Sequence, residues 1–353
     1  MKLVVEDLRL GYGEVGVVDG LSFELESGRI GCLLGASGCG KTTVLRAIAG
    51  FEPVRAGRIL IGGETVAAPG HSLPPEKRGI GMVFQDFALF PHLNVEENIA
   101  FGLRRMNPGR RRLRVQELIR LTGLHGLEQR YPHELSGGQQ QRAALARALA
   151  PSPRVLLLDE PFSSLDAGLR RQMGEELRRM LIDQGTTALL VTHDQQEAFA
   201  MADRIGLMAD GRLLQWASPY ELYHRPACRH VAAFTGRGHY LRAEVADGHL
   251  EHALGRTPVP PGLDLAPGQK VEILVRPDDL RPADDGVRAR VLSRQFLGAE
   301  ILYGLALPDG QSVAALFPSH LDHPVGATVR IALDAPHVVL FEPGGNAAMT
   351  ASV

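Results

Sequence analysis

Cysteine, lysine, tryptophan and long apolar runs are all scarce in this sequence of 353 residues. Its three cysteines, Cys32, Cys39 and Cys228, are too few for a disulfide framework or a cysteine-rich metal site, and they suit a reducing compartment. No apolar run reaches the ~18 residues that a membrane span needs, and acidic residues near the start interrupt any apolar signal peptide. We therefore expect a cytoplasmic protein, neither secreted nor membrane-spanning.

An excess of one charge is also absent, because 38 lysines and arginines face 40 aspartates and glutamates. A general nucleic-acid binder carries a basic surplus, so we expect no nucleic-acid partner. The arginine-rich run 104–114 contains proline and glycine, and we interpret it as a solvated loop and helix start rather than a nucleic-acid patch. The composition is that of a globular protein, and the length predicts about two domains.

The first two-thirds of the chain alternate strand and helix patterns. Short, nearly continuous apolar runs at 29–35, 154–160 and 188–194 predict strands that are buried on both faces. A helical pattern follows the first run and stops at Gly50, while apolar residues recur every four positions over 169–181. Strands that alternate with helices predict a mostly parallel sheet with helices on both sides.

The pattern changes near residues 234–242, and short runs separated by turn residues replace the helices. These runs span residues 270–277, 287–293, 300–310 and 328–334. They predict a small all-β barrel. We expect two domains, 1–235 and 242–345, and a loose tail after Pro343.

The segment from Gly35 to Thr43 fits the pattern G-x-x-x-x-G-K-[ST] between a predicted strand and a predicted helix. Its backbone N–H groups and the helix N-terminus form an anion site for the phosphates of ATP. We expect Lys41, one of only four lysines, to reach the β- and γ-phosphates, and the Thr42 hydroxyl to ligate Mg²⁺. The predicted ATP-binding residues are Gly35, Ser37, Gly38, Cys39, Gly40, Lys41, Thr42 and Thr43.

Two adjacent carboxylates end the apolar run at 154–160, and the strand delivers them to the carboxyl edge of the sheet. We expect Asp159 to hold Mg²⁺, mostly through water, and Glu160 to act as the general base toward the attacking water. Alone, the pair could be two solvated acids, but the phosphate loop upstream favours the catalytic interpretation.

The segment LSGGQQQR at 135–142 adds a second helix N-terminus suited to an anion. Ser136 also fits an ordinary helix N-cap, and the two interpretations are compatible. One chain then has two phosphate-binding surfaces, which a head-to-tail homodimer reconciles: each ATP lies between the phosphate loop of one subunit and this segment of the other. The residues assigned to this surface are Ser136, Gly137, Gly138 and Gln139.

Together these motifs resemble the ATPase subunit of an ABC transporter over residues 1–235. The resemblance implies that Tyr12 stacks on adenine and that Gln85 contacts Mg²⁺ and the attacking water. It also implies that Asp166, in the segment Ser-Ser-Leu-Asp, acts across the dimer and that His193 contacts the γ-phosphate. Lys41, Gln85, Glu160 and His193 are then the catalytic set, and Thr42, Gln85 and Asp159 the metal set.

The implied fold class is an α/β P-loop ABC nucleotide-binding domain, with a mostly parallel sheet and a helical subdomain, followed by a small all-β, OB-like (TOBE-type) domain. The implied ligands are ATP and Mg²⁺. The implied partners are a second copy of the chain, transmembrane permease subunits at the cytoplasmic face of the bacterial inner membrane and, indirectly, a periplasmic solute-binding protein. In this family residues 86–103 receive a short permease helix, and an ordinary helical-subdomain core explains them equally well.

Segments 130–151, 211–227 and 254–260 resemble the ferric-iron importer ATPases most closely, so Fe³⁺ is the expected solute. A polyamine, sulfate, thiamine or sugar remains an alternative, because the solute never contacts the ATPase. A soluble ABC ATPase acting on DNA or ribosomes is a weaker alternative, since the sequence lacks coiled-coil or zinc insertions. A ligand-sensing role for the barrel is a further alternative.

Overall fold

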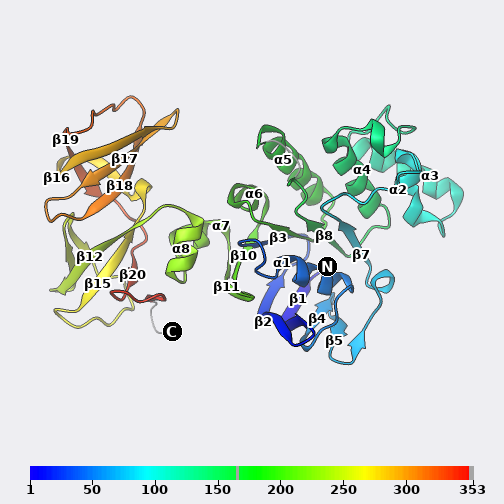
Figure 1. The fold of residues 1–353 in the computed structure, drawn as a ribbon, viewed down its shortest axis with the longest axis horizontal. Helices are drawn as coiled ribbons and strands as arrows, with labels where there is room; N and C mark the ends of the chain where they lie inside the picture. Colours follow the sequence, from blue (N-terminus) through cyan, green and yellow to red (C-terminus); the bar gives the residue numbers. More distant parts are fainter. Residues whose placement is uncertain (164–166, 350–353) are drawn as a thin grey trace. The chain divides into compact units, whose positions relative to one another are not determined.

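The computed structural model describes residues 1–163 and 167–349, and the chain divides into two compact units, Met1–Pro219 and Tyr220–Val353 (Figure 1). The domain limits expected from the sequence, 1–235 and 242–345, stay a prediction. The compact units group the two short helices between residues 219 and 235 with the second unit. The first unit is an α/β structure, and the second consists mainly of antiparallel strands.

A six-stranded, mostly parallel sheet organises the first unit, with strand order β11-β10-β3-β9-β8-β7. Every residue of β3, β8 and β9 is buried, as expected for strands covered on both faces. Only β11 runs antiparallel to its neighbour. The strands are β3 (Ile30–Leu34), β7 (Ile80–Val83), β8 (Val155–Asp159), β9 (Ala188–Thr192), β10 (Arg204–Ala209) and β11 (Arg212–Ala217).

Helices connect the parallel strands of this sheet, as the alternating pattern predicted, whereas a short turn joins β10 to β11. The helices are α1 (Lys41–Ala49), α2 (Val95–Ala100), α3 (Pro108–Leu121), α4 (Gly137–Leu149), α5 (Ala167–Asp183) and α6 (Gln195–Met201). The first of them ends at Gly50, whose φ of 96° lies in the left-handed region. Helices α2, α3 and α4 contact one another and form a helical subdomain beside β7 and β8 (Figure 1).

The first unit also contains a five-stranded antiparallel sheet. Its order is β2-β1-β4-β5-β6. Alternate residues of β1 and β2 are buried and pack in one core with α1, a two-residue periodicity typical of a sheet with one solvated face. The strands are β1 (Leu3–Tyr12), β2 (Val15–Leu25), β4 (Ala56–Ile61), β5 (Glu64–Ala68) and β6 (His71–Ser72).

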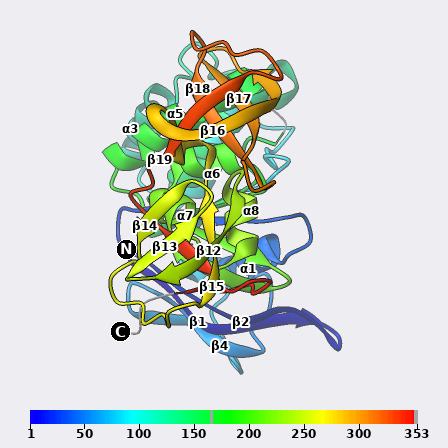
Figure 2. The same cartoon turned by 90° about the vertical axis from the view of Figure 1, so that its left-hand side faces the viewer.

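Two antiparallel sheets with a shared apolar core make up most of the second unit, and their orders are β14-β13-β12-β15-β20-β21 and β18-β17-β16-β19. Figure 2 shows β12 to β15 side by side. The strands are β12 (His239–Ala246), β13 (His249–His252), β14 (Gly255–Pro258), β15 (Lys270–Val275), β16 (Leu280–Phe296), β17 (Glu300–Ala306), β18 (Ser312–Pro318), β19 (Thr328–Leu333), β20 (Val339–Phe341) and β21 (Ala348–Met349). The predicted all-β domain is confirmed. The expectation of a loose tail is wrong up to residue 349, because β21 pairs with β20.

A buried arginine fastens the helices α7 (Pro219–His224) and α8 (Arg229–Thr235) to the strands of the second unit. Arg276, only 2% exposed, donates hydrogen bonds to the carbonyl oxygens of Tyr223 at 3.0 Å and Ala232 at 2.9 Å. It also donates to the carbonyl oxygen of Gly236 at 2.8 Å and the Thr235 hydroxyl at 3.1 Å. Burial lowers the pKa of Arg276. The guanidinium replaces the solvent that these polar groups lost on folding.

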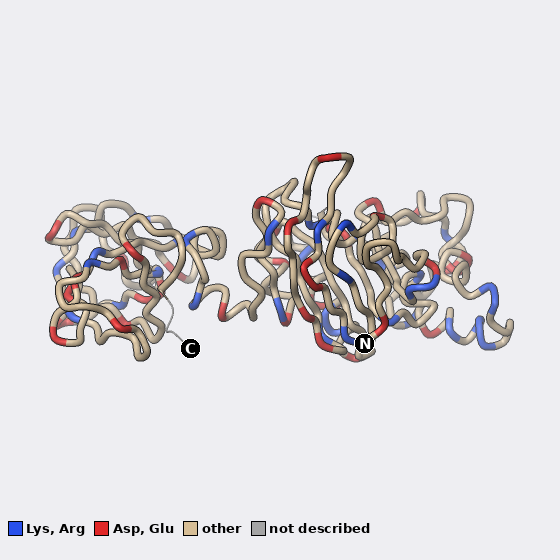
Figure 3. Tube along the Cα trace, turned by 90° about the horizontal axis from the view of Figure 1, so that it is seen from below, with Lys and Arg blue, Asp and Glu red and all other residues tan. Residues whose placement is uncertain are grey.

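Acidic and basic residues are interspersed along both units, and several basic residues gather around α3 (Figure 3). Most of the arginines in the run 104–114 are exposed, and α3 begins inside that run at Pro108. The predicted solvated loop and helix start are therefore confirmed. None of the helices within the described part of the chain has the length and apolar character required to span a membrane.

Candidate active site

The glycine-rich loop from Gly35 to Thr43 lies between β3 and α1, as the sequence predicted. Gly35 has a φ of 155°, and a Cβ there would lie 2.3 Å from the Met208 carbonyl oxygen, so only glycine fits without displacing the backbone. Lys41 is 5% exposed, and its Nζ donates to the carbonyl oxygens of Gly35 and Ala36 at 2.8 Å each. The ammonium is therefore fixed inside the loop.

The start of α1 is suited to an anion. Gly40 is the N-cap, and among the described residues no side chain caps this end, so the first N–H groups of the helix lack intrahelical partners. Ser37, Gly38 and Thr42 are exposed and Thr43 is half-buried, whereas Cys39 is buried. The loop thus combines free N–H groups, the helix dipole and one ammonium, which together fit the phosphates of a nucleotide.

Thr42 and Asp159 come from different elements and meet beside this loop. The Thr42 hydroxyl donates to Asp159 Oδ1 at 3.2 Å. Asp159 is 8% exposed, and burial raises its pKa. The hydrogen bond from Thr42 opposes this rise in pKa, whereas the neighbouring Glu160 carboxylate increases it. A buried carboxylate beside a hydroxyl is a pair of hard oxygen ligands that a bound divalent cation would stabilise. These two residues therefore fit the predicted Mg²⁺ site.

Glu160 and His193 form a second pair at the ends of β8 and β9. His193 Nδ1 lies 3.3 Å from Glu160 Oε2, and the two side chains are 52% and 19% exposed. The backbone of Glu160 has a φ of 42°, a left-handed conformation that is strained for a residue with a side chain. The N–H of Glu160 donates to the Val191 carbonyl oxygen at 3.0 Å. The pairing of β8 with β9 thus stabilises the strained backbone of Glu160. This conformation places the carboxylate at the edge of the sheet.

Gln85 and Asp159 line one open cleft of about 550 Å³, together with Phe84, Asp86 and Ser163. The cleft brings the predicted glutamine to the edge where the carboxylates lie. Gln85 therefore joins the candidate site, although its sequence position is far from every other member.

The segment after Gln85 is held by α4. Arg147 donates from Nη1 to the Ala88 carbonyl oxygen at 2.7 Å and from Nη2 to the Phe87 carbonyl oxygen at 3.0 Å. Both carbonyl-bearing residues have positive φ values, 61° for Phe87 and 45° for Ala88. This arginine was not predicted. The sequence of α4 carries no separate signal for this contact.

The second predicted phosphate surface begins α4 in the helical subdomain. The Ser136 hydroxyl accepts from the Gln139 N–H at 3.4 Å, and Gln139 Oε1 accepts from the Ser136 N–H at 2.9 Å, which is a capping box. Among the described residues, no hydrogen bond or ion pair joins Ser136–Gln139 to the loop at 35–43. Tyr12 is 51% exposed at the end of β1. Asp166 lies outside the described residues.

A buried carboxyl supports the His193 segment and was missed by the sequence analysis. Thr192 Oγ1 donates to Glu197 Oε2 at 2.6 Å and accepts from the Asp194 N–H at 3.0 Å. Arg170 of α5 pairs with Asp194 at 2.6 Å. Glu197 is 8% exposed, and burial raises its pKa to about 7. The local sequence of α6 carries no signal for this burial, which depends on packing in the folded unit.

Comparison with known proteins supports the family resemblance. Residues 18–163 match the ABC transporter family and residues 273–341 match the TOBE domain. The chain is similar to the Fe(3+) ions import ATP-binding protein FbpC of Streptomyces avermitilis, at 41% identity over 97% of this chain and 98% of that protein. It is also similar to the spermidine/putrescine import ATP-binding protein PotA of Rubrobacter xylanophilus, at 43% identity over 94% and 91%. The sulfate/thiosulfate import ATP-binding protein CysA 2 of Chromobacterium violaceum is 44% identical over 84% and 82%.

Proposed function

Because the chain belongs to the family of ATP-binding proteins of ABC import systems, and is therefore an ATPase, we propose that it hydrolyses ATP through Glu160 and His193. The observation that carries this proposal is the meeting of two pairs at one sheet edge, Thr42 with Asp159 at 3.2 Å and Glu160 with His193 at 3.3 Å. The phosphate loop next to them supplies the anion site.

Each residue has a definite task in this proposal. The N–H groups at the start of α1 and the Lys41 ammonium bind the β- and γ-phosphates and neutralise charge as the γ-phosphoryl group departs. The Glu160 carboxylate takes a proton from the attacking water, and His193 orients that carboxylate through the 3.3 Å contact. When bound, Mg²⁺ supplies further charge neutralisation at the phosphates, with Thr42, Asp159 and Gln85 as the residues that would hold it.

The variant Glu160→Gln tests this assignment. It keeps the size and hydrogen-bonding capacity of the side chain but removes the base, so turnover should fall by about 100-fold or more while ATP still binds. Glu175→Gln on α5, where the side chain is exposed, is the matched control for the loss of one charge. Near-normal turnover in Glu160→Gln would remove Glu160 from the mechanism.

The capping box of Ser136 and Gln139 has no hydrogen bond to the phosphate loop among the described residues, which supports a head-to-tail homodimer. Each ATP would lie between the loop of one copy and residues 136–139, with Asp166, of the other. Lys41→Ala and Ser136→Arg should each abolish activity alone. Mixing the two variants should restore it, because a mixed dimer contains one site with both intact halves. A mixture as inactive as its parents would contradict the shared site.

The transported solute is proposed to be ferric iron, with transmembrane permease subunits and a periplasmic solute-binding protein as partners at the cytoplasmic face of the inner membrane. Similarity to the FbpC proteins and the segments quoted above support this choice. Polyamine import is the second candidate, since PotA proteins are equally similar. Deletion of the gene should abolish uptake of radiolabelled Fe³⁺ and leave spermidine uptake unchanged; the reverse result would favour the polyamine.

A further inference from the structure

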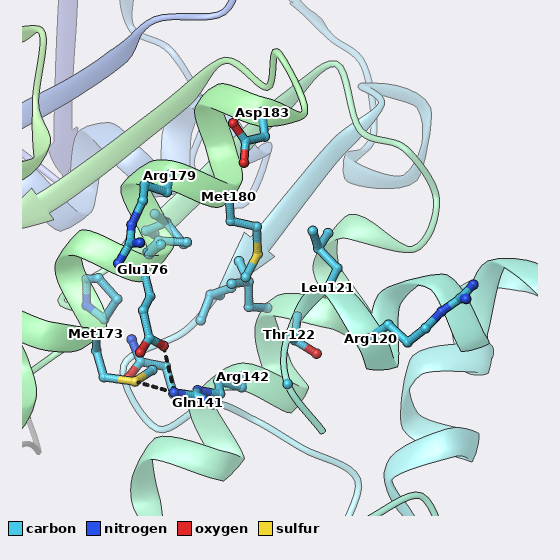
Figure 4. A pocket seen from close by; sticks show the side chains of 16 residues that line it. Arg120, Leu121, Thr122, Gln141, Arg142, Met173, Glu176, Arg179, Met180 and Asp183 are labelled. Carbon is cyan, nitrogen blue, oxygen red and sulfur yellow. Dashed lines mark hydrogen bonds and ion pairs between the residues drawn. The ribbon is translucent and has the colours of Figure 1, made fainter. Parts of the chain in front are cut away.

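A cavity that the ATPase proposal does not use lies in the first unit between the helical subdomain and α5 (Figure 4). Its volume is about 460 Å³, within the roughly 300–1,000 Å³ of typical small-molecule sites. It is lined from three helices, α3, α4 and α5, and from the ends of β7 and β8. The space therefore lies where two substructures of the unit meet.

One part of the wall is apolar. Leu121 of α3 and Met180 of α5 point toward one another across the space, while Arg120 points away from it (Figure 4). Met173, Leu177 and Leu145 continue this wall, and all three are buried. Such a lining favours a ligand with an apolar, aromatic or aliphatic body.

The other part of the wall is polar and incompletely paired. Arg142 Nη2 donates to Glu176 Oε2 at 2.6 Å, and this nitrogen also contacts Met173 Sδ at 3.6 Å. Gln141 is 4% exposed, yet its Oε1 has no hydrogen-bond partner among the described residues. A buried acceptor without a donor is costly, so a ligand that brings an N–H or O–H group would satisfy it. The guanidinium beside it would receive an anionic group.

The floor of the cavity adjoins the catalytic set in sequence. Leu158 directly precedes Asp159, Pro161 directly follows Glu160, and Val83 lies two positions before Gln85. A molecule bound here would touch the neighbours of the residues to which we assign metal and water binding. Since packed interiors transmit displacements, a shift of these neighbours would move the carboxylates beside them.

We propose that this cavity is a binding site for a small amphipathic organic acid that carries a hydrogen-bond donor, and that its occupancy regulates the ATPase. The apolar body contacts Leu121 and Met180, the donor pairs with Gln141 Oε1, and the acid group accepts from Arg142. The regulatory half of this statement rests on the proposed function, whereas the binding half does not.

The probe for the binding half is 8-anilinonaphthalene-1-sulfonate, which combines an aromatic body, one N–H group and a sulfonate. Its fluorescence on the full chain should saturate at one site. Gln141→Leu should raise the dissociation constant of the probe about tenfold, because one hydrogen bond is lost. Leu121→Trp, which fills the cavity, should abolish the saturable signal. Circular dichroism on both variants verifies that they are folded.

Phe296→Ser is the control for nonspecific adsorption, because Phe296 is a large exposed apolar residue, 64% exposed, in the second unit. It should leave the dissociation constant unchanged. Absence of saturable binding to the unaltered protein would overturn the site. A constant that stays within twofold in both Gln141→Leu and Leu121→Trp would overturn it equally, since the probe would then bind elsewhere.

The regulatory half is tested by reciprocity. A ligand that alters nucleotide binding must have its own affinity altered by nucleotide to the same extent. A saturating non-hydrolysable ATP analogue with Mg²⁺ should change the dissociation constant of the probe by at least about fivefold. An unchanged constant would overturn regulation while the binding result stands. If the proposed catalytic role of Glu160 proved wrong, neither binding measurement would change, because no ATP is hydrolysed in them.

Discussion

Replacing Glu197 by glutamine should remove a pH dependence from the stability of the first unit. The Glu197 carboxyl is buried below the His193 segment; Thr192 donates to one oxygen, and the other oxygen, Oε1, has no partner among the described residues. Burial raises the pKa of Glu197 from an ordinary value near 4.5 to about 7; the Asp194 carboxylate adds to the rise, while the Thr192 hydrogen bond and the charges of Arg170 and His193 oppose it.

The sign and size of the effect follow from proton linkage. With a raised pKa, the folded chain binds more protons than the unfolded chain between about pH 4.5 and pH 7. The free energy of unfolding therefore falls as the pH rises through this window and is level above it. The difference between the two pKa values, about 2.5, corresponds to about 3 kcal/mol in full. Between about pH 5 and pH 8 the change is about 2.5 kcal/mol.

Denaturant titrations followed by tryptophan fluorescence measure this effect. Trp216 is the single tryptophan of the sequence and packs against Phe23 with ring centroids 4.7 Å apart, so it reports on the first unit. The stability of Glu197→Gln relative to the unaltered protein should increase by about 2.5 kcal/mol from pH 5 to pH 8. Glu175→Gln serves as the charge control. A relative stability of Glu197→Gln that is constant across this range would refute the reasoning.

Three further predictions concern packing and positioning. Arg276→Met should destabilise the second unit by at least about 3 kcal/mol in thermal unfolding, because several buried carbonyl groups lose their donor. Arg147→Met should lower kcat for ATP by about 10- to 100-fold with a folded chain, because the segment after Gln85 loses two hydrogen bonds. Gly35→Ala should cost more than about 2 kcal/mol in denaturant unfolding, because its Cβ would overlap the Met208 carbonyl oxygen.

The parallel sheet was predictable because its strands are buried on both faces, and the sequence of such a strand is a continuous apolar run. Residues 155–159 and 188–192 are the strongest cases, and both are strands buried at every position. The antiparallel sheet was less visible. The alternation of buried residues in β1 is interrupted at the register shift between Val5 and Leu8, and a bulge of this kind breaks the two-residue period that sequence reasoning relies on.

The residues of the candidate site also differ in how far the sequence could predict them. Lys41, Thr42, Asp159 and Glu160 belong to local motifs, so strand–loop–helix geometry alone brings them to one edge. Glu197 and Arg147 act through tertiary packing. Nothing within the HDQQE segment specifies that the carboxyl of Glu197 is buried, because its burial depends on packing in the folded unit. The carbonyl groups that Arg147 binds are 59 and 60 residues away in sequence.

Helix α4 connects the proposed partner nucleotide site, the cavity beside α5 and the segment after Gln85. It begins at Ser136, which we assign to the nucleotide of the partner copy, and its first turns contribute Gln141 and Arg142 to the cavity beside α5. Its last turn carries Arg147, which holds the segment after Gln85. Eleven residues at 1.5 Å each separate Ser136 from Arg147, a span of roughly 16 Å. A nucleotide at Ser136 and a ligand at Gln141 would both contact the helix that holds the segment after Gln85 through Arg147, so the two proposed sites predict coupling through α4.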